Sequence, residues 1–155
     1  MIIAQEKRKT NIAEYIIYMW QVEDIIRALK LDMERIEEVM VNQYNVEEDK
    51  KAEVKYWYQN LVLMMQKEQK QQSGHLQFLI NLTDELNRFH QLLIERNIDQ
   101  DYSRLFFDIQ PDLQLIREKS GQNHHDIEVS LNALYLILML KMKNQEISEG
   151  TQNVV

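Results

Sequence analysis

The residues best suited to chemistry lie in the segment from His124 to Glu128, which has the sequence HHDIE. On a helix His124 and Glu128 are one turn apart, and His125 is three residues before Glu128, so two of these side chains could converge on one cation. A metal site needs a complete ligand set, and a third ligand would come from another helix, with His75 or His90 as candidates. The same segment is typical of a helix N-terminus, where polar residues cap free amides. We favour capping, with a metal site at His124, His125 and Glu128 as the alternative.

Other catalytic and cofactor motifs are missing from the sequence. No histidine follows a glutamate by three residues, which argues against the paired Glu-x-x-His ligands of di-iron bundles. The chain has no cysteine, which excludes disulfides, thiolate metal sites and thiol nucleophiles. Its three glycines are isolated, so no glycine-rich phosphate loop exists. We therefore predict no catalytic residue and no cofactor.

A weaker catalytic hypothesis comes from Arg117 and His124, which have six residues between them. This spacing resembles that of HEPN-type helical ribonucleases, and the resemblance implies a histidine and an arginine acting on the ribose hydroxyl and the scissile phosphate. Gly121 lies between the two residues and would interrupt a continuous helix. The net charge of −7 also argues against RNA as a partner.

Composition defines the elements that must position these residues. Average usage in a chain of this length would give about eleven glycines and eight prolines, but the 155 residues contain three and one. Such scarce turn-formers exclude sandwiches, barrels and α/β folds. The longest apolar run, Ala133 to Leu140, is far shorter than the ~20 residues of a membrane span. The first residues turn charged too early for a secretory signal. We expect a cytoplasmic protein with no membrane or nucleic-acid partner.

The apolar periodicity predicts a single all-α domain over residues 1–147, a bundle of five to six mostly antiparallel helices. The predicted helices cover residues 11–28, a short stretch from residue 32, and residues 46–72, 75–96, 101–119 and 123–145. The 101–119 stripe keeps its phase through Pro111, which favours one kinked helix over two helices split by a turn. The last helix is apolar almost all round between Leu131 and Met142, which predicts a central position. The tail, residues 148–155, is either disordered or the start of a further helix that Thr151 would cap.

Three polar side chains fall on or beside the apolar faces of these helices. His75 and His90 lie along or at the edge of the seam of the 75–96 helix, and we expect each to be partly buried and hydrogen-bonded. Glu68 is in register with a core seam, so it either has a partner there or emerges into water at the helix end.

A second apolar stripe on two helices suggests association. On the first helix Ile17 and Trp20 lie beside Asp24 and Arg27, opposite the main stripe, and Glu23 is spaced to form a surface ion pair with Arg27. A tryptophan surrounded by charges is typical of an interface hot spot. The 46–72 helix carries Tyr56 and Leu63 opposite its seam. These stripes receive either another helix of the bundle or a partner chain, most simply in a two-fold homodimer.

The first helix also carries a family resemblance. Residues 3–8 (IAQEKR), 11–15 (NIAEY) and 18–27 (YMWQVEDIIR) resemble the opening of a family of small all-helical bacterial proteins, catalogued as a domain of unknown function. The resemblance implies a cytoplasmic helical protein without an established activity, and relatives that continue past Val155. Our leading hypothesis is a non-enzymatic interaction or assembly module that forms a homo-oligomer or binds an unidentified protein. A metal-dependent enzyme or binder and a HEPN-like ribonuclease are the alternatives.

Overall fold

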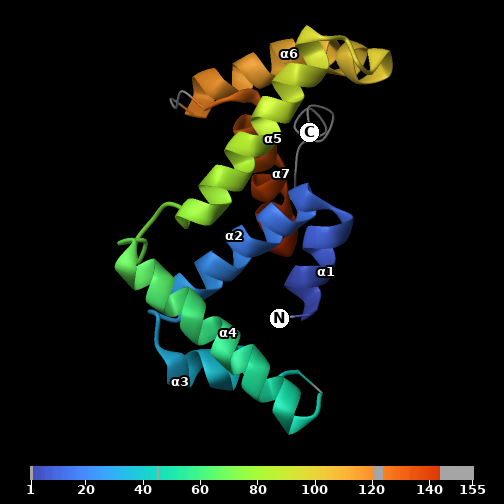
Figure 1. Cartoon of the computed structure of the whole chain (residues 1–155). Coiled ribbons are helices and arrows are strands. Elements are labelled where there is room, and N and C mark those ends of the chain that lie inside the picture. The colour runs from blue at the N-terminus through green and yellow to red at the C-terminus, as the bar shows by residue number, and fades with distance from the viewer. Residues whose placement is uncertain (1, 45, 121–123, 144–155) are drawn as a thin grey trace. The chain divides into compact units, whose positions relative to one another are not determined.

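The chain is all-helical in the computed structural model, which describes residues 2–44, 46–120 and 124–143. Those residues form seven α-helices and one π-helical turn, and contain no strand (Figure 1). The predicted fold class is therefore confirmed, but not the exact bundle of five to six helices. The structure separates into two compact units, residues 1–80 and 81–155. The predicted single domain over 1–147 stays a prediction. The tail, residues 148–155, lies outside the described residues.

Among the described residues, unit 1 contains four α-helices and a π-helical turn. They are α1 (Ile2–Thr10), α2 (Ile12–Ala28), α3 (Met33–Ile36), the π-turn η1 (Glu37–Val41) and α4 (Glu48–Lys67). The first turn of α5 (Gln77–Glu95) also belongs to this unit. Helix α1 ends at Thr10 and packs against α2. The predicted first helix, residues 11–28, begins after it.

Helix α2 forms where the sequence predicts, because its N-cap and its apolar stripe agree. The Asn11 side chain accepts a hydrogen bond from the backbone N–H of Glu14 at 3.1 Å, which satisfies one free amide of the first turn. The apolar stripe residues Ile16, Met19 and Ile26 each have an exposed fraction of 1% or less. The helix end is closed by Lys30 and Leu31 in the left-handed region.

The short elements α3 and η1 of unit 1 pack against α4 (Figure 1). Asp32 caps α3 through hydrogen bonds from the amides of Glu34 and Arg35. Ile36, Tyr58 and Met65 are fully buried in the resulting core.

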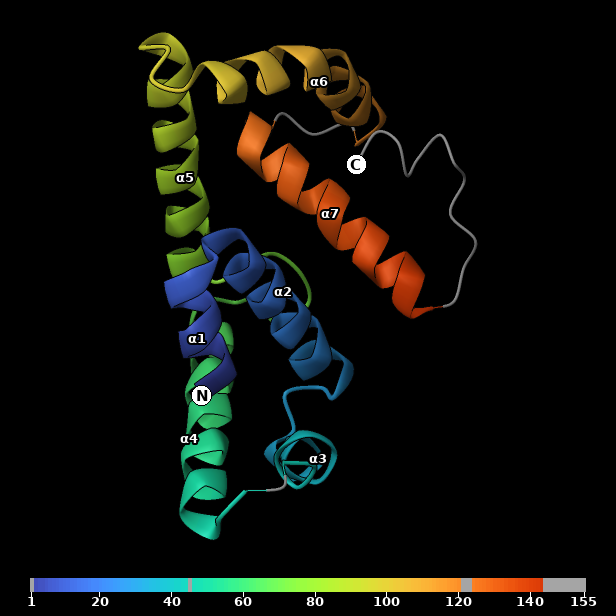
Figure 2. The ribbon, with the colours of Figure 1, turned by 90° about the vertical axis from the view of Figure 1, so that its right-hand side faces the viewer.

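Unit 2 consists of the rest of α5, then α6 (Gln100–Ser120) and α7 (Asp126–Met142). Helix α5 ends at Glu95, close to the predicted end at residue 96, and the positive φ of 45° at Asn97 allows the Ile98 N–H to donate back to the Leu93 carbonyl at 3.1 Å. Helix α6 runs through Pro111 as one helix, so the alternative of two split helices is excluded. It packs against α7 (Figure 2), and their shared core contains Phe106, Leu113 and Val129, with Ile94, Ile109 and Ile116 packed beside it.

The predicted central position of the last helix is not confirmed. Only Val129 and Leu131 of α7 are buried, whereas Leu134 is 42% and Leu136 is 58% exposed. The apolar character of α7 is therefore real, but the described residues of unit 2 do not enclose it. None of the helices formed by the described residues combines the length and the apolarity needed to cross a membrane.

Candidate functional site

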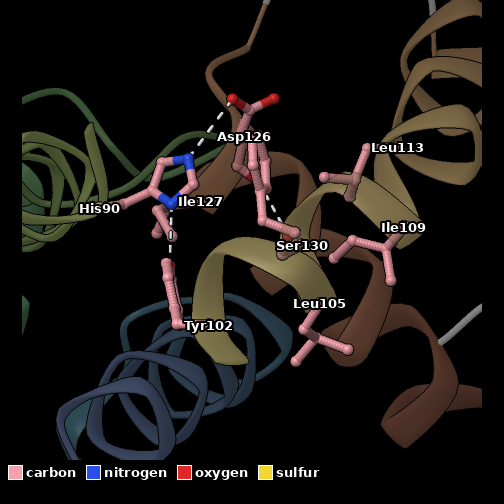
Figure 3. A pocket seen from close by; sticks show the side chains of 9 residues that line it. His90, Tyr102, Leu105, Ile109, Leu113, Asp126, Ile127 and Ser130 are labelled. Carbon is pink, nitrogen blue, oxygen red and sulfur yellow. Dashed lines mark hydrogen bonds and ion pairs between the residues drawn. The ribbon is translucent and has the colours of Figure 1, made fainter. Parts of the chain in front are cut away.

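A groove in unit 2 runs between α6 and α7. Its polar end is a pocket of about 60 Å³ next to His90, Tyr102 and Asp126 (Figure 3). A larger apolar space of about 230 Å³ adjoins it. The two spaces form one groove because four residues line both: Leu105, Ile109, Leu113 and Ser130.

His90 is the central polar residue of this groove. Its side chain is 4% exposed and lies between Tyr102 and Asp126 (Figure 3). The Nδ1 atom is 2.8 Å from the Tyr102 hydroxyl, and the ring packs edge-on against Phe106. Its Nε2 atom is 3.7 Å from Asp126 Oδ2, which is too long for a hydrogen bond. The prediction that His90 is buried and hydrogen-bonded is confirmed.

Asp126 is held from its other side by Arg117. The guanidinium Nη2 donates to Asp126 Oδ1 at 2.6 Å, and Nε donates to the His124 carbonyl at 3.0 Å. The Ser130 hydroxyl donates to the Asp126 carbonyl at 2.9 Å, one helical turn later. These contacts fix the carboxylate at the first residue of α7, with Oδ2 directed to His90.

Burial determines the charge state of the polar pocket. Desolvation lowers the pKa of His90, and this effect exceeds the opposing influence of the Asp126 carboxylate. Desolvation, assisted by the same carboxylate, raises the pKa of the Tyr102 hydroxyl. At neutral pH the pair is therefore a neutral imidazole and a protonated phenol.

The segment from His124 to Glu128 forms a helix cap, as favoured from its sequence. The Glu128 N–H donates to His125 Nδ1 at 3.1 Å, so the neutral imidazole carries its proton on Nε2. That Nε2 lies 3.3 Å from Asp84 Oδ1, while His124 Nδ1 lies 2.8 Å from Glu128 Oε2. A metal ion at Nε2 would require the proton to move to Nδ1, which would remove the cap on the Glu128 N–H. Within the described ranges, no group of three histidine or carboxylate side chains is placed to hold one.

Arg117 of the ribonuclease-like pair contacts the backbone carbonyl of His124 through Nε, and its Nη1 and Nη2 donate to Gln114 and Asp126. The ribonuclease hypothesis stays a prediction. Gly121 lies outside the described residues.

A second polar cluster lies inside unit 1, around Glu23. This carboxylate is 0% exposed, accepts a hydrogen bond from the Leu76 N–H at 2.8 Å and lies 2.6 Å from His75 Nδ1. The Trp20 indole stacks on the His75 ring with centroids 4.5 Å apart. The expected surface ion pair between Glu23 and Arg27 is therefore wrong, because Glu23 is turned inward to the segment before α5.

Arg27 closes the same segment from outside. Its Nε donates to the Lys70 carbonyl at 3.1 Å, Nη2 donates to the Gly74 carbonyl and Nη1 pairs with Asp24 at 2.7 Å. Glu68, the C-cap of α4, accepts a hydrogen bond from the Gln77 N–H at 2.7 Å, so it has a backbone partner. These contacts tie residues 68–77 to α2 and α4.

The six residues proposed for an interface differ in how far they are exposed to solvent. Trp20 is 3% exposed and packed inside unit 1, while Ile17, Asp24 and Arg27 are partly exposed. Tyr56 and Leu63 on α4 are 65% and 61% exposed. Of the two predicted stripes, only the α4 stripe is fully presented to solvent.

The inward position of Glu23 was not predicted, although the sequence carries a signal for it. Glu23 follows Ile16 and Met19 and precedes Ile26 at core spacing, which places a carboxylate on the buried face. The link between His90, Tyr102 and Asp126 had no comparable signal, because the three residues come from three helices.

A sequence family described as "Domain of unknown function (DUF4924)" matches the chain over residues 1–155. No curated protein and no solved structure matches it.

Proposed function

The chain belongs to the DUF4924 family, and from its described surface we propose a non-enzymatic assembly module that associates with a second copy of itself. The observation that carries the proposal is the apolar helix α7, which is only partly covered: Leu134 is 42% and Leu136 is 58% exposed. Its residues Ala133 to Leu140 are all apolar, and none of the eight is buried. A helix that is apolar on every face normally lies inside a core.

A second copy is the partner that this surface fits best. Each copy brings the same uncovered helix, so two-fold pairing would remove both apolar surfaces from water at once. Exposed Leu105 and Phe107 on the neighbouring α6 would enlarge the apolar area available. Tyr56 and Leu63 provide a separate apolar surface in unit 1, and Ile17, Asp24 and Arg27 remain candidates there.

The assignment as non-enzymatic is supported by the state of the histidines. Each of the four has a partner within the chain: Glu23 for His75, Tyr102 for His90, Glu128 for His124 and Asp84 for His125. The groups that most often act as bases at neutral pH are thus engaged in internal contacts.

Native mass spectrometry and light scattering over a concentration series test the proposal. We expect a dimer. Leu136→Glu should raise its dissociation constant by about 30-fold or more, because a buried charge replaces an apolar contact. Gln110→Glu adds the same charge at an exposed position of α6 and should leave the dimer intact.

Two outcomes distinguish the surfaces. A wild-type chain that stays monomeric at high micromolar concentration would contradict the module itself. Dissociation by Leu63→Glu but not by Leu136→Glu would move the interface from α7 to α4. Far-UV circular dichroism confirms that each variant keeps its helices.

A further inference from the structure

The groove between α6 and α7 has the chemistry of a binding site for a small amphipathic molecule. Its body is lined by apolar side chains, including Ile109, Ile116 and Ala133. Its polar end presents a nearly fully buried imidazole, His90, and the carboxylate of Asp126 (Figure 3). An apolar cavity with a few convergent polar groups is typical of small-molecule sites.

The hydrogen-bond pattern at the polar end follows from the contacts of His90. The Asp126 carboxylate faces Nε2 and favours the tautomer with the proton on that nitrogen, so Nδ1 accepts a hydrogen bond from the Tyr102 hydroxyl 2.8 Å away. The neutral ring then carries its own proton on Nε2. This N–H donor faces the Asp126 Oδ2 acceptor across 3.7 Å without a direct hydrogen bond.

A hydroxyl oxygen satisfies both groups at once. Placed off the line between Nε2 and Oδ2, one oxygen can lie about 2.8 Å from each, accepting from Nε2–H and donating to Oδ2. A carboxylate head would meet the like charge of Asp126. An ammonium head would direct its protons at the Nε2–H donor, and Arg117 already neutralises the carboxylate.

We propose that this groove binds a small alcohol with an apolar chain, its hydroxyl between His90 and Asp126 and its chain along Ile109, Ile116 and Ala133. The groove shares Leu105 and Ala133 with the surface proposed for assembly, but Leu136, the residue that tests assembly, does not line it, so the two tests can fail separately.

A head-group series on the whole chain provides the test. Isothermal titration calorimetry with 1-octanol, octanoate and octylammonium compares three probes that share one chain. We expect saturable binding of 1-octanol, at least about tenfold tighter than the other two, because only the hydroxyl matches the donor and the acceptor. Equal affinities for the three probes, or no saturable binding of 1-octanol, would overturn the proposal.

Two variants locate the bound molecule. Ala133→Leu fills the apolar part of the groove and should weaken 1-octanol binding about tenfold, whereas Gln110→Leu places the same side chain on exposed α6 surface and should have no effect. Tyr102→Phe keeps the aromatic ring but removes the donor to Nδ1, so 1-octanol should bind about threefold more weakly. Unchanged affinity in Ala133→Leu would contradict the assigned site, and the wild-type series stands even if that variant fails to fold.

Discussion

Sixteen of the twenty buried apolar side chains among the described residues belong to unit 1, and four belong to unit 2. The exposed large apolar side chains show the opposite distribution, since eight of the thirteen lie in unit 2. Both units are built from amphipathic or apolar helices. The difference therefore lies in how much of the apolar surface each unit closes by itself.

The polar groups of the two units differ in the same way. In unit 1 the buried Glu23 carboxylate contacts His75 and the Leu76 amide, and the Trp20 indole stacks on the His75 ring. In unit 2 the buried His90 opens onto a groove, and its Nε2 lacks a direct hydrogen bond to Asp126. A buried carboxylate with hydrogen-bonded partners is typical of a stabilising core contact, and a buried imidazole beside a groove is typical of a binding site.

The largest effect that would sharpen this comparison is expected from Glu23→Ala in unit 1. Removing the buried carboxylate leaves the Leu76 N–H and the His75 Nδ1 without their partner, which should lower the free energy of unfolding by about 3–5 kcal/mol. Urea unfolding followed by tryptophan fluorescence measures it, because both tryptophans, Trp20 and Trp57, lie in unit 1.

Glu14→Ala is the matched control on the same helix. Its carboxylate is 53% exposed and pairs with Lys7, so the loss should stay below about 1 kcal/mol. Equal losses in the two variants would break the comparison, since Glu23 would then behave as a surface residue.

The sequence was sufficient to predict much of unit 1 because its determinants are local. The Asn11 cap and the stripe of Ile16, Met19 and Ile26 each depend on neighbours within a few residues, and both are present. The partner of Glu23 is 52 residues away, so local spacing pointed instead to Arg27 one turn later. A contact of that range needs the tertiary arrangement.

Helix α7 shows a different limit of the sequence. Its pattern correctly indicated an apolar helix, but periodicity reports only that a surface avoids water. It does not tell whether the same chain or another molecule covers that surface. The predicted central position assumed the first case, whereas Leu134 and Leu136 are exposed.

A smaller effect should distinguish the N-caps of the two units. Asn11→Ala removes the acceptor for the Glu14 amide and should cost unit 1 about 1 kcal/mol, measured by urea unfolding with tryptophan fluorescence. His125→Ala removes the corresponding acceptor for the Glu128 amide in unit 2 and should leave the fluorescence transition unchanged. A shifted fluorescence transition in His125→Ala would show that the stabilities of the two units are coupled.

The smallest effect is expected from pH, because a single buried imidazole in unit 2 carries it. Desolvation places the pKa of His90 below its ordinary value of 6.5, so the unfolded chain binds a proton more readily than the folded one. Stability from this group is fully present above pH 6.5 and falls as the pH is lowered from there through the folded pKa. NMR titration of the imidazole resonances should place the midpoint of His90 below 6.5, and Tyr102→Phe should leave the sign of the shift unchanged because burial causes it. A midpoint above 6.5 would mean that the Asp126 carboxylate dominates, and the open, neutral pocket that distinguishes unit 2 from unit 1 would instead hold an ion pair.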